Sequence, residues 1–152
     1  MVINVNKLKI GFIFIKDILL NIFSNETVVL ITEAVDWSIY EDCKNIKNNL
    51  KNVLPIRISI TPLGIRNKII HFASVNTFIK KNGIVKYSKS NKIILTWFHL
   101  VDGDKRISYI PKLNDLVYIV HTSCNITMDK LVIAGLKREK ISVIPLGIDR
   151  RV

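Results

Sequence analysis

Short apolar runs alternate along the chain with stretches in which apolar residues recur every three or four positions. Runs that are apolar at successive positions are typical of strands buried on both faces of a parallel sheet, and the wider spacing is typical of helices packed on that sheet. The pattern predicts strands at residues 28–31, 56–60, 68–72, 92–98, 116–120 and 141–144. We therefore expect an α/β fold with three layers, α/β/α, around a mostly parallel sheet.

The clearest predicted helix covers residues 37–50, because one face is apolar and the other carries charged residues. Shorter helices are expected at residues 75–81 and 105–114, with a turn at Asn82 and Gly83 between the first of them and the next strand. Pro111 cannot donate a helical hydrogen bond, so it should kink or restart the helix that contains it. A last helix should begin at Thr122, Ser123 or Asn125 and end at Gly135.

The first 25 residues are apolar but interrupted by Lys16 and Asp17. They contain no run of roughly 18 apolar residues, the length that a transmembrane helix needs, and no small-residue cleavage site of a secretory signal. A role in docking to a membrane surface or to a partner stays open. We expect residues 1–26 to be an extension of uncertain role, residues 27–149 to form the domain, and residues 150–152 to begin a linker.

Composition agrees with one folded domain, since 152 residues with 49% hydrophobic residues, 6 Gly and 4 Pro can form a core. Cys43 and Cys124 are far apart and lack the spacing of metal ligands. We expect them to be buried thiols in a reducing, cytoplasmic compartment.

The net charge of +11 is uneven, because residues 76–152 hold 14 basic and 6 acidic side chains against 9 and 6 before them. The lysine cluster consists of Lys80, Lys81, Lys86, Lys89 and Lys92. It could meet an anionic membrane surface or phosphorylated ligands, or it could be a solvated face. Because Tyr87 is the only aromatic residue interleaved in this cluster, a base-stacking surface is poorly supported and we do not expect nucleic acid as a partner.

Several sequence motifs of well-known enzyme classes are missing. The chain has no GxGxxG after its first strand and no GxxxxGK[ST], so it lacks the usual dinucleotide and nucleoside triphosphate cradles. It has no GxSxG either, which argues against a serine hydrolase. The Asp102-Gly103-Asp104 triplet can be interpreted as a metal and diphosphate site, as a solvated turn or as a helix start. We expect no metal.

In parallel sheets, ligands bind beyond the carboxyl ends of the strands. The segments that follow the predicted strands are residues 33–37, 71–74, 99–104, 122–125 and 145–149. Among them, His99 directly follows a predicted buried strand, and an imidazole there could accept a hydroxyl proton or bind a sugar. A structural histidine is the alternative interpretation.

Four motifs, in order along the chain, resemble a known family. They are Ile69-Ile70-His71-Phe72-Ala73-Ser74, then Thr96-Trp97-Phe98-His99, then His121-Thr122-Ser123, and finally Lys140-Ile141-Ser142-Val143-Ile144-Pro145-Leu146-Gly147-Ile148-Asp149. Together they are similar to the first domain of the family 4 glycosyltransferases, whose GT-B architecture has two facing Rossmann-like domains. The resemblance covers residues 27–149 and implies a Rossmann-like domain, one half of a GT-B fold.

The resemblance implies a retaining glycosyltransferase of the hexosyltransferase class. The nucleotide-sugar donor would be a co-substrate, with no other cofactor, and the acceptor would be a glycan or a lipid-linked sugar. His99 would be the catalytic residue beside the reacting centre. The residues implied in acceptor binding are Glu33, Asp36, Trp37, Ser74, Thr96 and Ser123. The hinge and donor-side residues would be Pro145, Gly147 and Asp149.

Two departures from the family pattern limit this interpretation. Residues 33–36 replace the glycine-rich first loop of many members, and the basic pair and Glu-x7-Glu segment that the family carries in its donor domain, after the motif that ends at Asp149, are not present. We therefore expect the chain to supply the acceptor side, to be inactive alone, and to meet a donor domain on a separate chain. A lipid-linked acceptor would place it peripherally at the inner face of the membrane. The alternative is a non-catalytic Rossmann-like binding or partner module.

Overall fold

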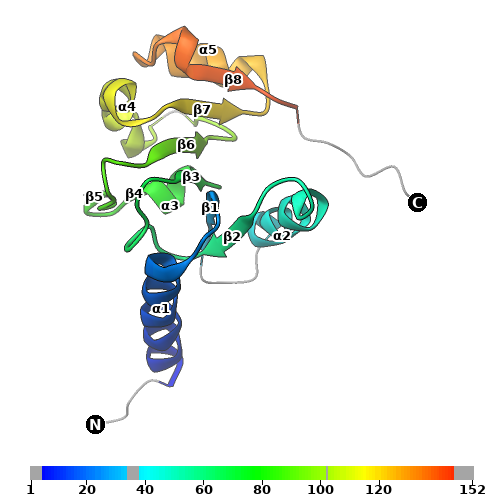
Figure 1. Cartoon of the computed structure of the whole chain (residues 1–152). Coiled ribbons are helices and arrows are strands. Elements are labelled where there is room, and N and C mark those ends of the chain that lie inside the picture. The colour runs from blue at the N-terminus through cyan, green and yellow to red at the C-terminus, as the bar shows by residue number, and fades with distance from the viewer. Residues whose placement is uncertain (1–4, 34–37, 102, 146–152) are drawn as a thin grey trace. The chain divides into compact units, whose positions relative to one another are not determined.

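The computed structural model describes residues 5–33, 38–101 and 103–145, with side chains from residue 10 onward. The fold is α/β and Rossmann-like, with a six-stranded parallel sheet flanked by helices, as the alternating pattern predicts (Figure 1). The chain divides into two compact units, residues 1–92 and 93–152. Among the helices of the described ranges, none is long and apolar enough to cross a membrane.

The first unit contains three parallel strands in the order β2-β1-β3, in which Val28 lies opposite both Ile56 and Ile69. Its elements are α1 (Val5–Phe23), β1 (Val28–Ile31), α2 (Ser38–Leu50), β2 (Ile56–Ser59), β3 (Ile69–Phe72), α3 (Val75–Phe78), β4 (Ile79–Lys80) and β5 (Gly83–Ile84). The last two strands form a small antiparallel hairpin around the predicted Asn82-Gly83 turn.

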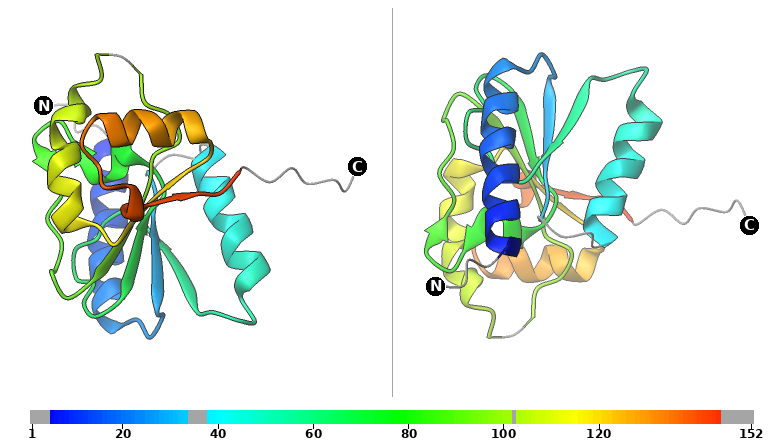
Figure 2. Two further views of the ribbon diagram at one scale, coloured as in Figure 1. Left: turned by 90° about the horizontal axis from the view of Figure 1, so that it is seen from above. Right: turned by 90° about the horizontal axis from the view of Figure 1, so that it is seen from below.

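The alternation of β2 decides which helix covers each of its faces. Ile56 and Ile58 belong to the apolar cluster beneath α2. The buried members of this cluster are Val28, Leu30, Cys43, Ile56 and Ala73. Successive side chains of a strand point to opposite faces, so Arg57 and Ser59 face the other way, where both bond Asp17 of α1. Helices α1 and α2 therefore cover opposite faces of β2, which gives this unit three layers (Figure 2).

The second unit also has three parallel strands, in the order β6-β7-β8. Its elements are β6 (Lys92–Thr96), η1 (Lys105–Tyr109), α4 (Ile110–Leu116), β7 (Ile119–Thr122), α5 (Asn125–Ile133), η2 (Arg138–Lys140) and β8 (Ile141–Val143). Fully buried side chains from β6, the residue after it, α4, β7 and α5 form its core, namely Leu95, Trp97, Ile110, Leu113, Val120 and Leu131.

Two predicted boundaries in this unit are wrong. The run at residues 116–120 is not one strand, because Leu116 ends α4 and the Val117 N–H still donates to the Leu113 carbonyl at 3.0 Å. Strand β7 starts only at Ile119. Strand β6 ends at Thr96 rather than at residue 98. By contrast, the restart at Pro111 is confirmed, since this proline lies in the first turn of α4, where a missing N–H costs nothing.

Helix ends depend on tertiary pairing that a local pattern does not contain. The helix predicted at residues 75–81 stops at Phe78, because Ile79 pairs with Ile84 in the β4–β5 hairpin. The helix α5 ends before Gly135, which has the positive φ of 102° expected of a helix-terminating glycine. Its N-cap is Cys124, which makes no side-chain capping bond, so none of the three predicted capping residues holds that position.

The segment before β1 forms the long helix α1, although the sequence pattern assigned it no structure. It belongs to the first unit, because Asp17 and Asn21 bond residues 57–63. The expectation that both cysteines are buried is wrong for Cys124, which is exposed, and correct for Cys43.

Candidate functional site

The predicted catalytic residue lies on a loop that directly follows β6. His99 is exposed, and its carbonyl accepts a hydrogen bond of 3.1 Å from the indole Nε1 of Trp97. Trp97 is completely buried, and its backbone N–H donates to the His121 carbonyl at 2.8 Å. The backbone of His99 is thus tied to a core residue, while the imidazole faces solvent.

Side chains at the start of α5 and within it also bond this loop, through the carbonyls on either side of His99. The Phe98 carbonyl accepts hydrogen bonds from the hydroxyls of Thr127, at 3.2 Å, and Ser123, at 3.4 Å. The Leu100 carbonyl lies 3.5 Å from the ammonium of Lys130. Three consecutive carbonyls, at residues 98–100, therefore have side-chain donors. Such anchoring lowers the entropy that the loop would lose on binding a ligand.

His121, which the sequence interpretation did not single out as a site residue, links the ends of three strands. Its Nε2 lies 3.1 Å from the Ile144 carbonyl after β8, and its Nδ1 lies 3.2 Å from the Thr96 hydroxyl on β6. A carbonyl only accepts, so Nε2 carries the proton, and in the neutral ring Nδ1 accepts from Thr96. Thr96, predicted to bind the acceptor, is only 2% exposed, so the His121 ring that it bonds lies between its hydroxyl and the solvent.

Three of the predicted residues, Thr96, His99 and Ser123, therefore belong to one connected region of the second unit. Pro145, a predicted hinge residue, is exposed and directly follows Ile144, whose carbonyl this region uses. The predicted residues Asp36, Trp37, Gly147 and Asp149 lie outside the described residues.

The other two predicted acceptor residues lie in the first unit, after the paired parallel strands β1 and β3. Glu33 is half-buried and follows Thr32, whose N–H donates to the Ser59 carbonyl at 3.1 Å. Ser74 is buried and caps α3, because its hydroxyl accepts from the Asn76 N–H at 3.2 Å. The lone pair that Ser74 uses as a cap is not available to a sugar, although the hydroxyl can still donate.

Asp104 of the DxD triplet starts a helix. Its carboxylate caps η1 by accepting from the Arg106 N–H at 2.9 Å, and it also accepts from the Arg106 guanidinium at 2.6–3.0 Å. Arg106 thereby holds the pKa of Asp104 below its usual value. Across residues 5–33, 38–101 and 103–145, no group of three His, Cys, Asp or Glu side chains could hold a metal ion. Asp102 lies outside these ranges.

The pKa values of the two thiols are shifted in opposite directions. The Thr127 hydroxyl, 3.4 Å from the sulfur of Cys124, is the main cause that lowers the pKa of this exposed thiol. Burial raises the pKa of Cys43 to about 11. We assign Cys124 no role in the candidate site.

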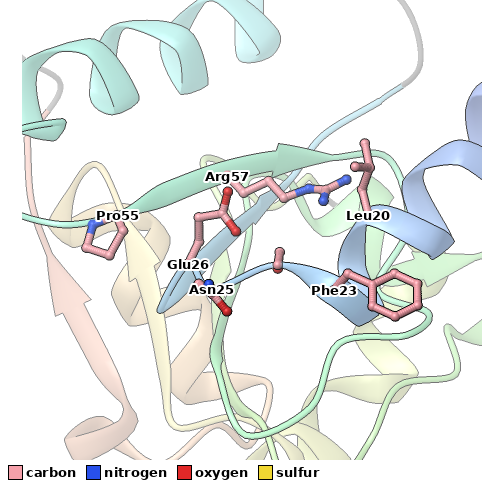
Figure 3. A pocket seen from close by; sticks show the side chains of 7 residues that line it. Leu20, Phe23, Asn25, Glu26, Pro55 and Arg57 are labelled. Atoms are coloured by element: carbon pink, nitrogen blue, oxygen red, sulfur yellow. The ribbon is translucent and has the colours of Figure 1, made fainter.

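Two open cavities lie in the first unit, beside the end of α1 and at the amino ends of the strands. The first has about 460 Å³ and is lined by Leu20, Phe23, Ser24, Asn25, Glu26, Pro55 and Arg57 (Figure 3). The second has about 370 Å³ and is lined by Asn21, Ile22, Gly64, Arg66 and Lys68. In parallel sheets, ligands bind at the carboxyl ends of strands. We therefore place the candidate site at His99, directly after β6, rather than in these two cavities.

Comparisons with protein families, curated proteins and solved structures give no match to this chain. The candidate site thus depends on the residues themselves. Sequence reasoning found His99 and Ser123 from their positions after strands, but it missed Thr127 and Lys130. The spacing of Ser123 and Thr127, four residues apart, was a usable signal, because such residues lie on one face of a helix.

Proposed function

We propose that this chain supplies the acceptor side of a retaining glycosyltransferase. The nucleotide sugar is the donor, and the acceptor is a glycan or a lipid-linked sugar. The proposal joins the family resemblance of the strand-end motifs to the geometry after β6. The observation that carries it is the exposed imidazole of His99 on a loop whose three carbonyls, at residues 98–100, are all hydrogen-bonded by side chains.

A sugar hydroxyl needs a partner that can both accept and donate a hydrogen bond. A neutral imidazole does both, and it can also accept the proton that a hydroxyl loses when it attacks a donor carbon. Holding the acceptor at a fixed position beside the reacting carbon contributes by orientation alone, provided that the loop does not move. We assign His99 the role of contacting the acceptor hydroxyl. Ser123 and Thr96 act as positioning residues for its loop and for His121.

The test is a binding measurement with the purified chain. It is titrated by calorimetry with a panel of oligosaccharides, with a polyprenyl-phosphate-linked sugar in detergent, and with uridine and guanosine diphosphate sugars. The proposal expects one acceptor class to bind more tightly than every nucleotide sugar. His99→Ala should weaken that binding about three- to tenfold, the size of one lost hydrogen bond.

The matched control is Ile133→Ala, which truncates an exposed side chain of the same unit and should leave the affinity unchanged. Both variants should keep the far-ultraviolet circular dichroism of the parent. Tight binding of a nucleotide sugar with no acceptor binding would assign the chain to the donor side and overturn the proposal. Equal affinities of the parent and His99→Ala would remove His99 from the site.

A non-catalytic binding or partner module is the second candidate. It is favoured by the two cavities beside α1, both of which are lined by residues of the first unit. In that case a ligand would bind near Arg57 and Arg66, and His99→Ala would leave its affinity unchanged. Arg66→Ala would weaken binding, and the same titrations would show it.

A further inference from the structure

The outward face of α1 is apolar. Its side chains Phe12, Ile15, Leu19, Ile22 and Phe23 are exposed by 72%, 60%, 52%, 55% and 78%. Their spacing places them within about a third of the helix circumference, opposite Asp17. We call these five residues the outer stripe. Single exposed apolar residues are common, but a continuous stripe of large ones on one helix marks a surface that another phase or molecule covers.

The helix cannot turn this stripe inward, because its polar residues hold the opposite face. The Asp17 carboxylate accepts from the Ile60 N–H at 2.7 Å and from the Ser59 hydroxyl at 2.9 Å. The Asn21 amide donates to the carbonyls of Thr61 and Leu63, at 2.9 Å each. The usual polarity of a surface helix is thus reversed, with polar groups facing the domain and apolar groups facing out.

The surroundings of the outer stripe are cationic. Lys16 is exposed on α1, and Arg66 and Lys68 line the cavity that Ile22 also lines. In Figure 3 the guanidinium of Arg57 extends from β2 toward Leu20 at the end of α1, but its side chain is only 9% exposed and pairs with Asp17, so we do not count it among these cations. The same unit also exposes all five residues of the lysine cluster. The acidic side chain nearest the end of α1, Glu26, has one carboxylate oxygen buried.

We propose that α1 docks on an anionic lipid membrane, with the outer stripe inserted at the boundary of headgroups and acyl chains and the surrounding cations on the lipid phosphates. Apolar side chains flanked by Lys and Arg are the combination by which interfacial helices bind such surfaces. A second copy of the chain is the less suitable occupant, because each copy carries a net charge of +11 and would bring the same cations against the stripe. The inference does not depend on the proposed transferase function.

The test is co-sedimentation of the full chain with vesicles of phosphatidylcholine, alone or with about 30% phosphatidylglycerol. The chain should bind the anionic vesicles, and binding should weaken as salt is added. The double variant Phe12→Gln, Leu19→Gln should lower the partition coefficient about a hundredfold, or about tenfold for each large side chain withdrawn from lipid. Lys16→Gln with Arg66→Gln should lower it by more than tenfold, about fivefold for each charge.

The matched control is Val53→Gln with Ile133→Gln, because these residues are 80% and 87% exposed but do not belong to α1. It should change binding less than twofold. Urea unfolding checks that each variant keeps the stability of the parent. Vesicle binding by the outer-stripe variant equal to that of the parent would overturn the proposal. So would a dimer in size-exclusion chromatography that is lost in the outer-stripe variant while no vesicles bind.

Discussion

Removing the Asp17 carboxylate should detach α1 from its anchor. This group accepts the Ile60 N–H at 2.7 Å and the Ser59 hydroxyl at 2.9 Å, and it lies 3.5 Å from the Arg57 guanidinium. The side chains of Asp17 and Arg57 are only 15% and 9% exposed. In Asp17→Ala the buried N–H loses its partner, which costs about 1–3 kcal/mol. Arg57 also stays buried without its counter-charge, so we expect a total loss of about 3 kcal/mol.

The comparison that isolates burial is the ion pair of Glu41 and Lys44 on α2. Its atoms are closer, at 2.7 Å, but its side chains are 56% and 42% exposed. Water screens such a pair, so Glu41→Ala should cost no more than about 0.5 kcal/mol. If distance alone decided the loss of stability, Glu41→Ala would cost more than Asp17→Ala.

The assay is urea unfolding followed by circular dichroism, with the slope of the transition compared between variants to check that unfolding stays two-state. Replacing both partners, in Asp17→Ala with Arg57→Met, should recover about 1–2 kcal/mol of the loss, because no buried charge then remains unpaired. A loss in Asp17→Ala no larger than in Glu41→Ala would refute the reasoning.

Three further predictions concern single residues. Cys124 should react with a thiol reagent at neutral pH in the folded protein, because it is exposed and its pKa is lowered. Cys43 should react only after unfolding, because it is buried and burial raises its pKa to about 11. Mass spectrometry after digestion identifies which cysteine carries the reagent. Gly64→Ala should cost about 2 kcal/mol or more in urea unfolding, because φ is 85° and the new Cβ would lie 2.9 Å from a carbonyl of α1, whereas Gly103→Ala, with φ of 79° and open space, should cost only about 1 kcal/mol. Asp104→Asn should destabilise the protein by about 1 kcal/mol at neutral pH. Its arginine partner lowers the folded-state pKa, so this stabilisation is complete above about pH 4 and is lost as the pH falls through the lowered value; a variant whose deficit persists at pH 2 would contradict this.

The strands and the amphipathic helix α2 could be predicted because each repeats a simple period over its whole length. Strand β1 is buried at every position, which is why the run at residues 28–31 was recognisable. The boundary at Leu116 failed for the opposite reason. Apolar residues continue from α4 into β7 without a break, so the pattern did not show where one element ends and the other begins.

The helix α1 and the anchors of the His99 loop could not be predicted from local pattern. In α1 the polar residues Lys16 and Asp17 look like an interruption of an apolar segment, but Asp17 is the inward contact to β2. The Trp97 indole looks like part of a buried strand, yet it holds the carbonyl of His99. Both roles depend on partners that are distant in sequence or on the position where a strand stops.

The most direct test of the central claim is an amide chemical-shift map of the chain with an acceptor glycan that binds it. The account predicts the largest shifts at residues 98–100 and 123–127, and in His99→Ala these shifts should need about three- to tenfold more glycan to reach half their full size. Shifts confined to residues 20–26 and 57–68, around the two cavities, with unchanged signals at His99 would contradict it.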